Sequence, residues 1–409
     1  MIAVLDAPVC RRASVLALAP VVGADVSVPA TGHPGGVAYA NLDYAASAPA
    51  LTAVADRLAG ALAEYASVHR GAGHLSQVTT ARYEQARETV RTFVGGRADD
   101  TVVFTRNTTD SINLAASIVP GDVVVLDIEH HANLLPWKRT GRARVVESQS
   151  TIDATLAALE AELASAPAAL LAVTAASNVT GEVLPLARLA GLAHRHGARI
   201  LVDAAQLVAH RGVSIAGFGI DYLVFSGHKV YAPFGAGVLV GRPDWLDSAP
   251  PYLAGGGASA DVSIDDVAWH VGAARHEAGS PNVLGAVSIA AAADELRRVG
   301  FENIGTHDDA LIRRLDAGLA ALGHVRPLRA FDDGLDRVAI ASFTVDGHTP
   351  RAVAEHLSSR GIGVRDGKFC AHPLLAKLGR PTGAVRASFG VGTSSDDVDR
   401  LLEALAELA

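Results

Sequence analysis

The feature of this sequence that most constrains its fold is an alternation of short apolar runs with amphipathic stretches between residues 101 and 240. The apolar runs are too short for helices, whereas the stretches between several of them have helical spacing. Strands that alternate with helices form a mostly parallel sheet with helices on both faces, and ligands bind beyond the carboxyl ends of its strands. We therefore predict an α/β domain built on a mostly parallel seven-stranded sheet. The predicted strands are 102–104, 123–126, 144–147, 170–173, 200–202, 223–225 and 237–240, with helices near 109–117, 151–165 and 185–196.

A second domain is expected because 409 residues exceed the size at which one core keeps growing. The alternation ends after about residue 285, where a long helix leads into a segment that mixes helices and strands. We predict a large domain over 37–297. The smaller α+β domain comprises 298–409, together with residues 1–36, which we interpret as a leader and a loop.

Composition excludes several classes of protein. The net charge of −8 and the absence of a basic block argue against nucleic acid as a partner. No charge-free apolar run is long enough to span a membrane. Arg11-Arg12 and the apolar residues after them loosely resemble a signal peptide, but Pro20 interrupts the run, so we expect a leader and a cytoplasmic protein. Cys10 and Cys370 are far apart, which indicates neither a disulfide framework nor a metal site.

Two charged residues stand at the ends of predicted strands. The run 222–225 ends in Ser-Gly-His-Lys229, and the strand 200–202 ends at Asp203. Taken singly, Lys229 is explained by a surface position and Asp203 by a helix N-cap. Taken together, a lysine that joins an aldehyde and a carboxylate that pairs with a pyridine nitrogen are the mark of enzymes that use pyridoxal 5′-phosphate (PLP).

Further polar residues follow other predicted strands. Thr108 and Thr109 precede a helix, whose N-terminal N–H groups can bind a phosphate, although either threonine can also serve as an N-cap. His130 and His131 follow the strand 123–126, where a histidine can stack on an aromatic cofactor or move protons. We do not predict a metal site, because no partner ligand stands at metal-binding spacing.

The third group lies in the predicted small domain. Cys370 stands on a glycine-punctuated loop beside Arg365, Lys368 and His372, and positive charge lowers a thiol's pKa. The alternative is a buried structural cysteine. Arg386 lies in a predicted strand, where it can bind a substrate carboxylate through two hydrogen bonds.

With these residues in view, the sequence resembles the class V aminotransferase superfamily, and more closely the group II cysteine desulfurases of selenocysteine lyase-like type. The resemblance runs from about residue 41 to the C-terminus and implies the fold type I of PLP-dependent transferases. It rests on the order and spacing of ten segments: Leu42-Asp-Tyr-Ala-Ala-Ser-Ala48, His69-Arg-Gly71, Asn107-Thr-Thr-Asp-Ser-Ile-Asn113, Glu129-His-His-Ala-Asn-Leu-Leu-Pro-Trp137, Ser177-Asn-Val-Thr-Gly181, Val202-Asp-Ala-Ala-Gln206, Phe225-Ser-Gly-His-Lys229, Arg275-His-Glu-Ala-Gly-Ser-Pro-Asn282, Cys370-Ala-His-Pro-Leu374 and Arg386-Ala-Ser388.

The resemblance implies a role for each residue of the site. Lys229 would carry PLP covalently and move the substrate's α-proton, Asp203 would pair with the ring nitrogen, and His130 would stack on the ring. Arg386 would hold the substrate carboxylate, with Arg365 and Asn178 nearby, and Cys370 would take the sulfur of cysteine, or of a selenocysteine-like substrate, as a persulfide. Thr108, Thr109, Ser226 and His228 would bind the phosphate, Asn178 and Gln206 would contact the phenolate side of the ring, and Ser280 would reach the phosphate of a neighbouring subunit in a homodimer.

Two departures from the family pattern lie near the thiol. The family usually has Arg-x-Gly-His-His-Cys, whereas this chain has Arg365-Asp-Gly-Lys-Phe-Cys370. The family's histidine after His-Arg-Gly falls at Gly73, one place before His74. The sulfur acceptor, expected to be a protein, and the exact substrate therefore stay open. The alternatives are a PLP-dependent carbon–sulfur lyase, epimerase or aminotransferase that does not need Cys370, and a non-catalytic partner protein derived from the fold.

Overall fold

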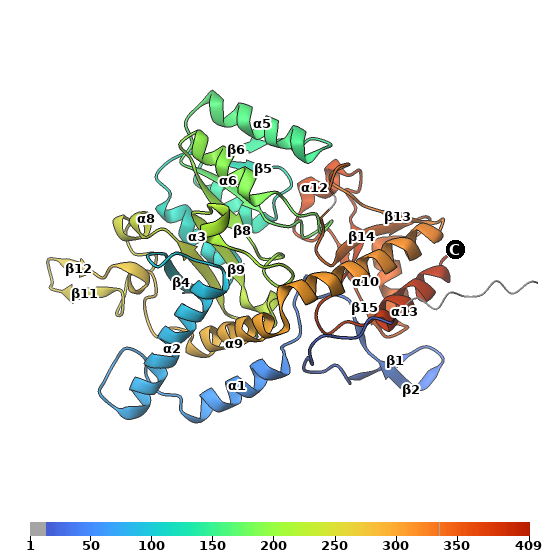
Figure 1. The fold of residues 1–409 in the computed structure, drawn as a ribbon, viewed down its shortest axis with the longest axis horizontal. Helices are drawn as coiled ribbons and strands as arrows, with labels where there is room; N and C mark the ends of the chain where they lie inside the picture. Colours follow the sequence, from blue (N-terminus) through green and yellow to red (C-terminus); the bar gives the residue numbers. More distant parts are fainter. Residues whose placement is uncertain (1–13, 335) are drawn as a thin grey trace, which may run out of the picture.

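The large sheet has seven strands, as predicted, and it organises most of the chain. The computed structural model describes residues 14–334 and 336–409 (Figure 1). The strand order is β4-β10-β9-β8-β7-β5-β6, in which β10 runs antiparallel to β4 and β9 and the other pairs are parallel. The strands are β4 (Thr101–Thr105), β5 (Val123–Leu126), β6 (Ala143–Val146), β7 (Leu170–Thr174), β8 (Arg199–Asp203), β9 (Tyr222–Ser226) and β10 (Gly237–Gly241). Each of the seven predicted strands is therefore confirmed.

Both faces of this sheet are buried, because successive side chains of a strand point to opposite faces. In β5, Val123 and Val125 pack into one core, while Val124 and Leu126 pack into another. Helices α3 (Thr108–Ile118), α4 (Leu135–Arg139) and α8 (Pro243–Ser248) contribute to the first core. The second core includes residues of α1 (Thr52–Ala63), α2 (His74–Phe93), α5 (Ile152–Ser165), α6 (Leu186–Arg195), α7 (Ile215–Phe218) and α9 (Val283–Val299).

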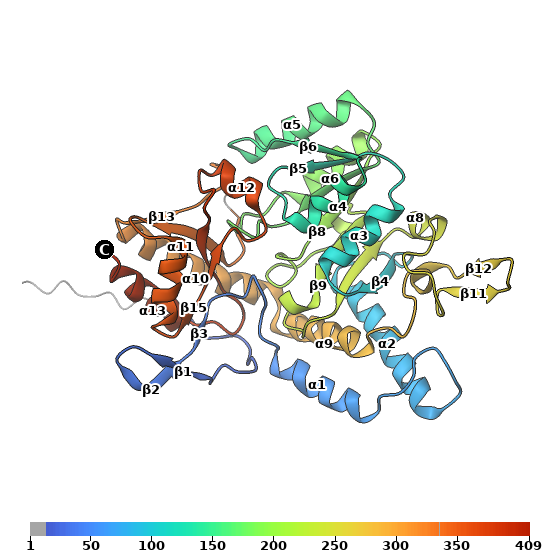
Figure 2. The ribbon, with the colours of Figure 1, turned by 180° about the vertical axis from the view of Figure 1, so that it is seen from behind.

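A smaller antiparallel sheet, in the order β13-β14-β17-β16, lies beside the large one. Figures 1 and 2 show α10 running from α9 along this sheet, with α11 and α13 nearby. Its core is built from apolar residues of these helices and of the two central strands. The elements are α10 (Phe301–Ala321), β13 (Val325–Pro327), β14 (Ile340–Val345), α11 (Pro350–Ser358), β16 (Arg365–Gly367), α12 (His372–Lys377), β17 (Ala384–Ser388) and α13 (Ser395–Ala406).

The N-terminal segment differs from its interpretation as a leader and a loop. Residues 1–13, which include Cys10, lie outside the described residues. After them, β1 (Ser27–Ala30) and β2 (His33–Ala38) form an antiparallel hairpin, and β3 (Ala40–Asn41) pairs in parallel with β15 (Ile362–Gly363). The sequence did not predict this hairpin, because its glycines are typical of loops. Gly32 and Gly36 have φ values of 79° and 76°, a conformation that favours glycine.

A polar cluster ties α10 to the end of the large sheet. Asp308 on α10 is fully buried and accepts a 2.7 Å hydrogen bond from His210, which follows β8. His307 extends the cluster by donating to the carbonyl of Thr393. A buried carboxylate needs such partners, and this cluster therefore joins α10 to the segment that follows β8.

None of the helices in residues 14–334 and 336–409 combines the length and apolar composition that crossing a bilayer requires.

Candidate active site

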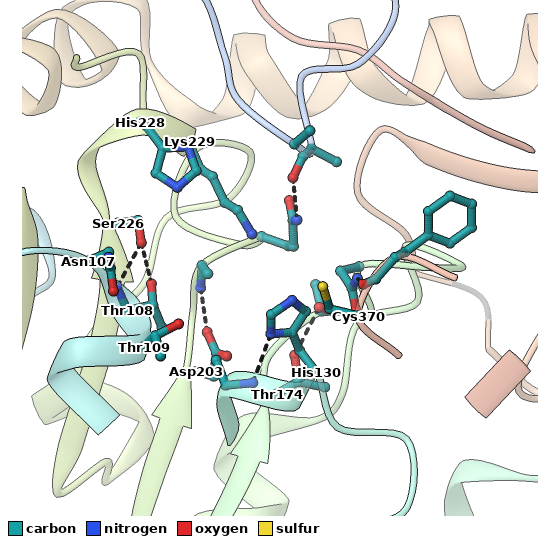
Figure 3. A pocket seen from close by; sticks show the side chains of 18 of the residues that line it. Asn107, Thr108, Thr109, His130, Thr174, Asp203, Ser226, His228, Lys229 and Cys370 are labelled. Atoms are coloured by element: carbon teal, nitrogen blue, oxygen red, sulfur yellow. Dashed lines mark hydrogen bonds between the residues drawn. The ribbon is translucent and has the colours of Figure 1, made fainter. Parts of the chain in front are cut away.

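The predicted site residues gather around one cavity of about 310 Å³, at the carboxyl ends of β7, β8 and β9 and against the smaller sheet (Figure 3). Twelve of the thirteen line it, although they come from distant parts of the chain. They are Thr108, Thr109, His130, Asn178, Asp203, Gln206, Ser226, His228, Lys229, Arg365, Cys370 and Arg386. Only Ser280 lies outside, on an exposed loop before α9.

One end of the cavity is formed by the N-terminus of α3. Asn107 caps this helix by accepting from the N–H of Asp110, and the first turn faces the end of β9. The Ser226 hydroxyl lies 2.8 Å from the Thr108 nitrogen and 2.6 Å from the Thr108 hydroxyl. This close approach depends on Gly237, because a Cβ there would lie 2.5 Å from Asn107 backbone atoms. N–H groups and hydroxyls at a helix N-terminus suit an anion such as phosphate.

Lys229 enters the cavity from the 3₁₀ turn η2 (Gly227–Lys229), which follows β9 directly. Burial lowers the pKa of its amine to about 8, while Asp203 raises it and Arg386 lowers it further. An amine with this pKa is partly neutral near physiological pH, and the neutral form attacks carbonyls. The adjacent His228 is also desolvated, since burial lowers its pKa to about 4 and its Nδ1 has no partner among the described residues.

Asp203 ends β8 with only 5% of its surface exposed. One carboxylate oxygen accepts the N–H of Ala205 at 3.0 Å. Burial raises the pKa of Asp203, whereas the Ala205 N–H and the Lys229 charge lower it. A buried carboxylate that has a single hydrogen bond within the described part of the chain, next to a cavity, is suited to pair with a protonated ligand nitrogen. Gln206 is anchored nearby by donating to the Ala45 carbonyl at 2.8 Å.

His130 caps the 3₁₀ turn η1 (His131–Asn133), because its Nδ1 accepts the N–H of Ala132 at 3.0 Å. A neutral ring with this acceptor carries its proton on Nε2. Burial lowers the pKa of His130 to about 3, and the charge of Lys229 contributes. The imidazole is therefore neutral at physiological pH, which suits stacking on an aromatic ring more than binding an anion.

The smaller sheet contributes Arg386, of which 3% is exposed. Its guanidinium donates to the Asn178 carbonyl at 3.0 Å and to Asp43 at 3.2 Å, and it lies over the Phe369 ring. Its Nε is buried without a partner among the described residues. A buried donor of this kind costs free energy unless a ligand binds it, so the geometry suits a carboxylate.

Cys370 stands on the loop between β16 and α12, where its side chain is exposed. Phe369 and Cys370 both have φ near 52°, a left-handed conformation that costs a non-glycine residue on the order of 1–2 kcal/mol. Two 2.8 Å hydrogen bonds to residues that follow strands of the large sheet fix the turn. Asn178 donates to the Phe369 carbonyl, and the His131 N–H donates to the Cys370 carbonyl.

Cys370 also borders a second hollow of about 320 Å³ on the outer side of the cavity. Leu135, which is 53% exposed, lies in this hollow, and Arg139 donates to Asn113 at its margin. We call it the outer trough; its lining residues are Thr109, Asn113, His130, His131, Ala132, Leu135, Pro136, Arg139 and Cys370.

Some contributors to the cavity were not assigned a role from the sequence. Thr174 and Phe369 line it, and Asp43 accepts a hydrogen bond from the Arg386 guanidinium. Thr174 directly follows the predicted strand 170–173 and ends β7 in the structure, so its place at a strand end was the one available signal. For Phe369, only the departure from the family pattern gave a signal.

The cavity fits PLP. An anion site at the start of α3, a buried carboxylate at Asp203 and a desolvated amine at Lys229 match the phosphate, the ring nitrogen and the aldehyde of that cofactor. The unpartnered Nδ1 of His228 and Nε of Arg386 are further polar atoms that a bound ligand can satisfy.

Comparisons with known proteins agree with this geometry. Residues 40–401 match the family model for class V aminotransferases. A cysteine desulfurase from Dickeya dadantii is 38% identical over 396 residues, which cover 90% of this chain and 92% of that protein. A probable cysteine desulfurase from Mycolicibacterium paratuberculosis is 35% identical over 90% of this chain, which spans only 55% of that relative's length. The apo structure of a cysteine desulfurase from Thermococcus onnurineus superimposes with a TM-score of 0.85 at 34% identity, covering 90% of this chain and 94% of that one.

The extent of these matches, together with a cavity that fits the cofactor, assigns the fold type I architecture of PLP-dependent enzymes. The chain belongs to the class V aminotransferase family, and proteins named cysteine desulfurases are among its relatives.

Proposed function

We propose that this protein is a cysteine desulfurase, which converts L-cysteine, or a selenocysteine-like substrate, to L-alanine and holds the released sulfur on Cys370. The observation that carries the proposal is the position of Cys370. It lines the same cavity as the Lys229 amine and the buried Arg386 guanidinium, and it also borders the outer trough. Names of relatives support the proposal, since the Dickeya and Thermococcus proteins are called cysteine desulfurases.

When bound, PLP supplies an aldehyde that joins an amine and a pyridine ring that withdraws electrons from the substrate's α-carbon. The chain's residues do the rest. Thr108, Thr109, Ser226 and His228 form the phosphate end of the cavity. Asp203 holds positive charge at the ring nitrogen, and Lys229, with a pKa of about 8, takes and returns the α-proton.

Arg386 orients the substrate by binding its carboxylate, with Asn178 holding both the guanidinium and the Phe369 carbonyl. The sulfur step then belongs to Cys370. Its thiolate attacks the substrate sulfur, and an S–S bond forms as the carbon–sulfur bond breaks. The electron pair of the broken bond stays with the carbon fragment, which takes up protons and leaves as alanine, while Cys370 keeps a persulfide.

We infer that the sulfur acceptor approaches through the outer trough. Leu135 offers exposed apolar surface there, and neither Lys138 nor Arg139 has a carboxylate partner within residues 14–334 and 336–409. Lys368, near Cys370, is likewise exposed and without such a partner in that part of the chain. In a chain with a net charge of −8, this cationic surface favours an acidic protein that presents a thiol.

A second candidate function rests on Phe369. Its ring lies in the cavity 5.0 Å from the Arg386 guanidinium, at a position where the family usually has histidine. A phenylalanine ring here narrows the part of the cavity in which the substrate would bind. It also replaces a histidine, which could donate a proton. This observation favours a PLP-dependent carbon–sulfur lyase, epimerase or aminotransferase in which Cys370 is not essential.

The proposal includes a homodimer, a cytoplasmic location and the division into domains at 37–297 and 298–409. Ser280 is exposed outside the cavity, where it is free to meet a second copy. The hairpin of β11 (Ser259–Val262) and β12 (Val267–Trp269) projects from the end of the molecule opposite the smaller sheet (Figures 1 and 2), and Ile264 at its turn is fully exposed. Light scattering gives the molar mass of the protein in solution, and we expect the mass of a dimer for wild type and that of a monomer for the I264D variant.

The proposed cytoplasmic location agrees with the exposed thiol of Cys370, because a reducing compartment would keep this thiol active.

The experiment that tests the function compares wild-type and C370A protein loaded with PLP. A desulfurase converts L-cysteine to equimolar alanine and bound sulfur. We expect the rate of alanine formation by C370A to be about 100-fold lower than that of wild type, or lower still, while the variant retains PLP. Unchanged alanine formation by C370A contradicts the proposal. A product other than alanine from a panel of larger amino acids supports the second candidate.

A further inference from the structure

Glu129 is a buried carboxylate beside the site to which the mechanism gives no role. Its side chain is fully buried, and it immediately precedes His130 in the sequence. One carboxylate oxygen accepts the backbone N–H of Thr174 at 3.0 Å, and the other accepts the Asn133 side-chain amide at 2.7 Å. Asn133 in turn accepts from the indole of Trp137 at 3.1 Å. The four groups form one continuous network beneath the turn that carries His130.

The place of this network in the sheet explains why a carboxylate stands there. Parallel pairing between β5 and β7 ends at Val125 and Ala172, so the N–H of Thr174 lies beyond the ladder. Thr174 pairs in register with Asp203 on the other side, at the end of β8. Glu129 thus satisfies a buried N–H where β5 has stopped, and it ties the His130 turn to the strand end beside Asp203.

We propose that Glu129 is a positioning residue, whose two acceptor oxygens fix the His130 turn against the end of β7 and so set the imidazole opposite the Asp203 carboxylate. Figure 3 shows His130, Thr174 and Asp203 around the same cavity. The inference rests on the proposed contact between His130 and the cofactor ring, and it concerns how the chain holds that histidine.

Glutamine at position 129 cannot replace this carboxylate. In either protonation state both oxygens of glutamate can accept, whereas one end of a glutamine amide only donates. The Asn133 amide cannot rotate to accommodate it, because its oxygen is held by Trp137. In E129Q a buried donor therefore meets a donor, and the His130 turn shifts. We expect about a tenfold or greater rise in the PLP dissociation constant and an altered circular dichroism of the bound cofactor's visible band.

Glu182 provides a matched control. It is a buried carboxylate that also accepts two N–H groups, from Ala330 at 2.8 Å and Phe331 at 3.0 Å, but it does not line the cavity. We expect E182Q to lower the unfolding temperature about as much as E129Q, with a PLP dissociation constant within twofold of wild type and an unchanged cofactor spectrum.

The double variant E129Q/N133D tests the network by rescue. The introduced amide donates to the introduced carboxylate, which still accepts from Trp137, while the amide oxygen accepts from Thr174. The number of charges stays the same. We expect the double variant to return the PLP dissociation constant to within about threefold of wild type and to restore the dichroism of the cofactor band.

Three results would overturn the proposal: wild-type affinity and dichroism in folded E129Q, equal changes in E182Q, or no restoration in the double variant. If E129Q alone fails to fold, the double variant decides, and its failure to fold or to restore the spectrum counts against the proposal. Loss of alanine formation in C370A is measured separately, so failure of the proposed function is distinguishable from failure of this inference.

Discussion

Gly237 on β10 offers a direct test of the phosphate end of the cavity. In G237A the new Cβ would lie 2.5 Å from backbone atoms of Asn107, the residue that caps α3. Ordinary carbon contacts begin near about 3.5 Å, so α3 must move away from β9 and β10 by about 1 Å. A displacement of that size removes donors from a bound phosphate, since hydrogen bonds fail beyond about 3.5 Å.

The expected magnitude follows from the bonds lost. One or two charge-assisted hydrogen bonds, at about 1.5–3 kcal/mol each, raise the PLP dissociation constant by roughly 10- to 100-fold or more. Overpacking also lowers the free energy of unfolding by about 1–3 kcal/mol. Titration of the apoprotein with PLP and with pyridoxal separates the two effects, because pyridoxal has no phosphate and its affinity should change far less.

The matched control is G323A, where an added Cβ meets no atom of the described residues within 4 Å. It should bind PLP and pyridoxal as wild type does. The reasoning is refuted if G237A binds PLP within twofold of wild type, or if the affinities for PLP and pyridoxal fall equally.

The remaining predictions concern protonation, substrate and acceptor. The rate at which apoprotein takes up PLP at Lys229 should rise with pH and level off above about 8, in line with the pKa of about 8 for its amine; a flat profile contradicts this. This pKa lies below that of an unfolded lysine, so the free-energy cost of burying the charged amine is largest below pH 8 and disappears as pH rises toward about 10.4. The free energy of unfolding of the apoprotein should therefore increase over this range, which denaturation at several pH values checks. R386K should raise KM for cysteine by about 10- to 100-fold, because a lysine cannot form two parallel hydrogen bonds to a carboxylate; unchanged KM in steady-state kinetics removes Arg386 from substrate binding. L135D should slow sulfur transfer to a protein acceptor while alanine formation with dithiothreitol stays at the wild-type rate, and equal effects on both reactions argue against the outer trough.

Local patterns in the sequence were sufficient to predict the large sheet. Each of its strands is a short apolar run, and both faces of the sheet are buried, so no alternation with polar residues obscures it. The order of strands and helices implied that strand ends meet at one edge, which is where Asp203 and Lys229 line the same cavity. The N-terminal hairpin escaped notice because its strands are exposed and rich in glycine and proline.

The tertiary structure alone decided how the smaller sheet completes the site. Cys370 and Arg386 reach the cavity because hydrogen bonds to His131 and Asn178 join segments about two hundred residues apart, and no local pattern encodes such a pairing. Burial, which sets the pKa of Lys229 and of His130, likewise depends on what packs around a side chain. The sequence by itself determined which chemical groups the chain carries and at which strand ends they stand. Their distances, desolvation and partners follow from long-range packing.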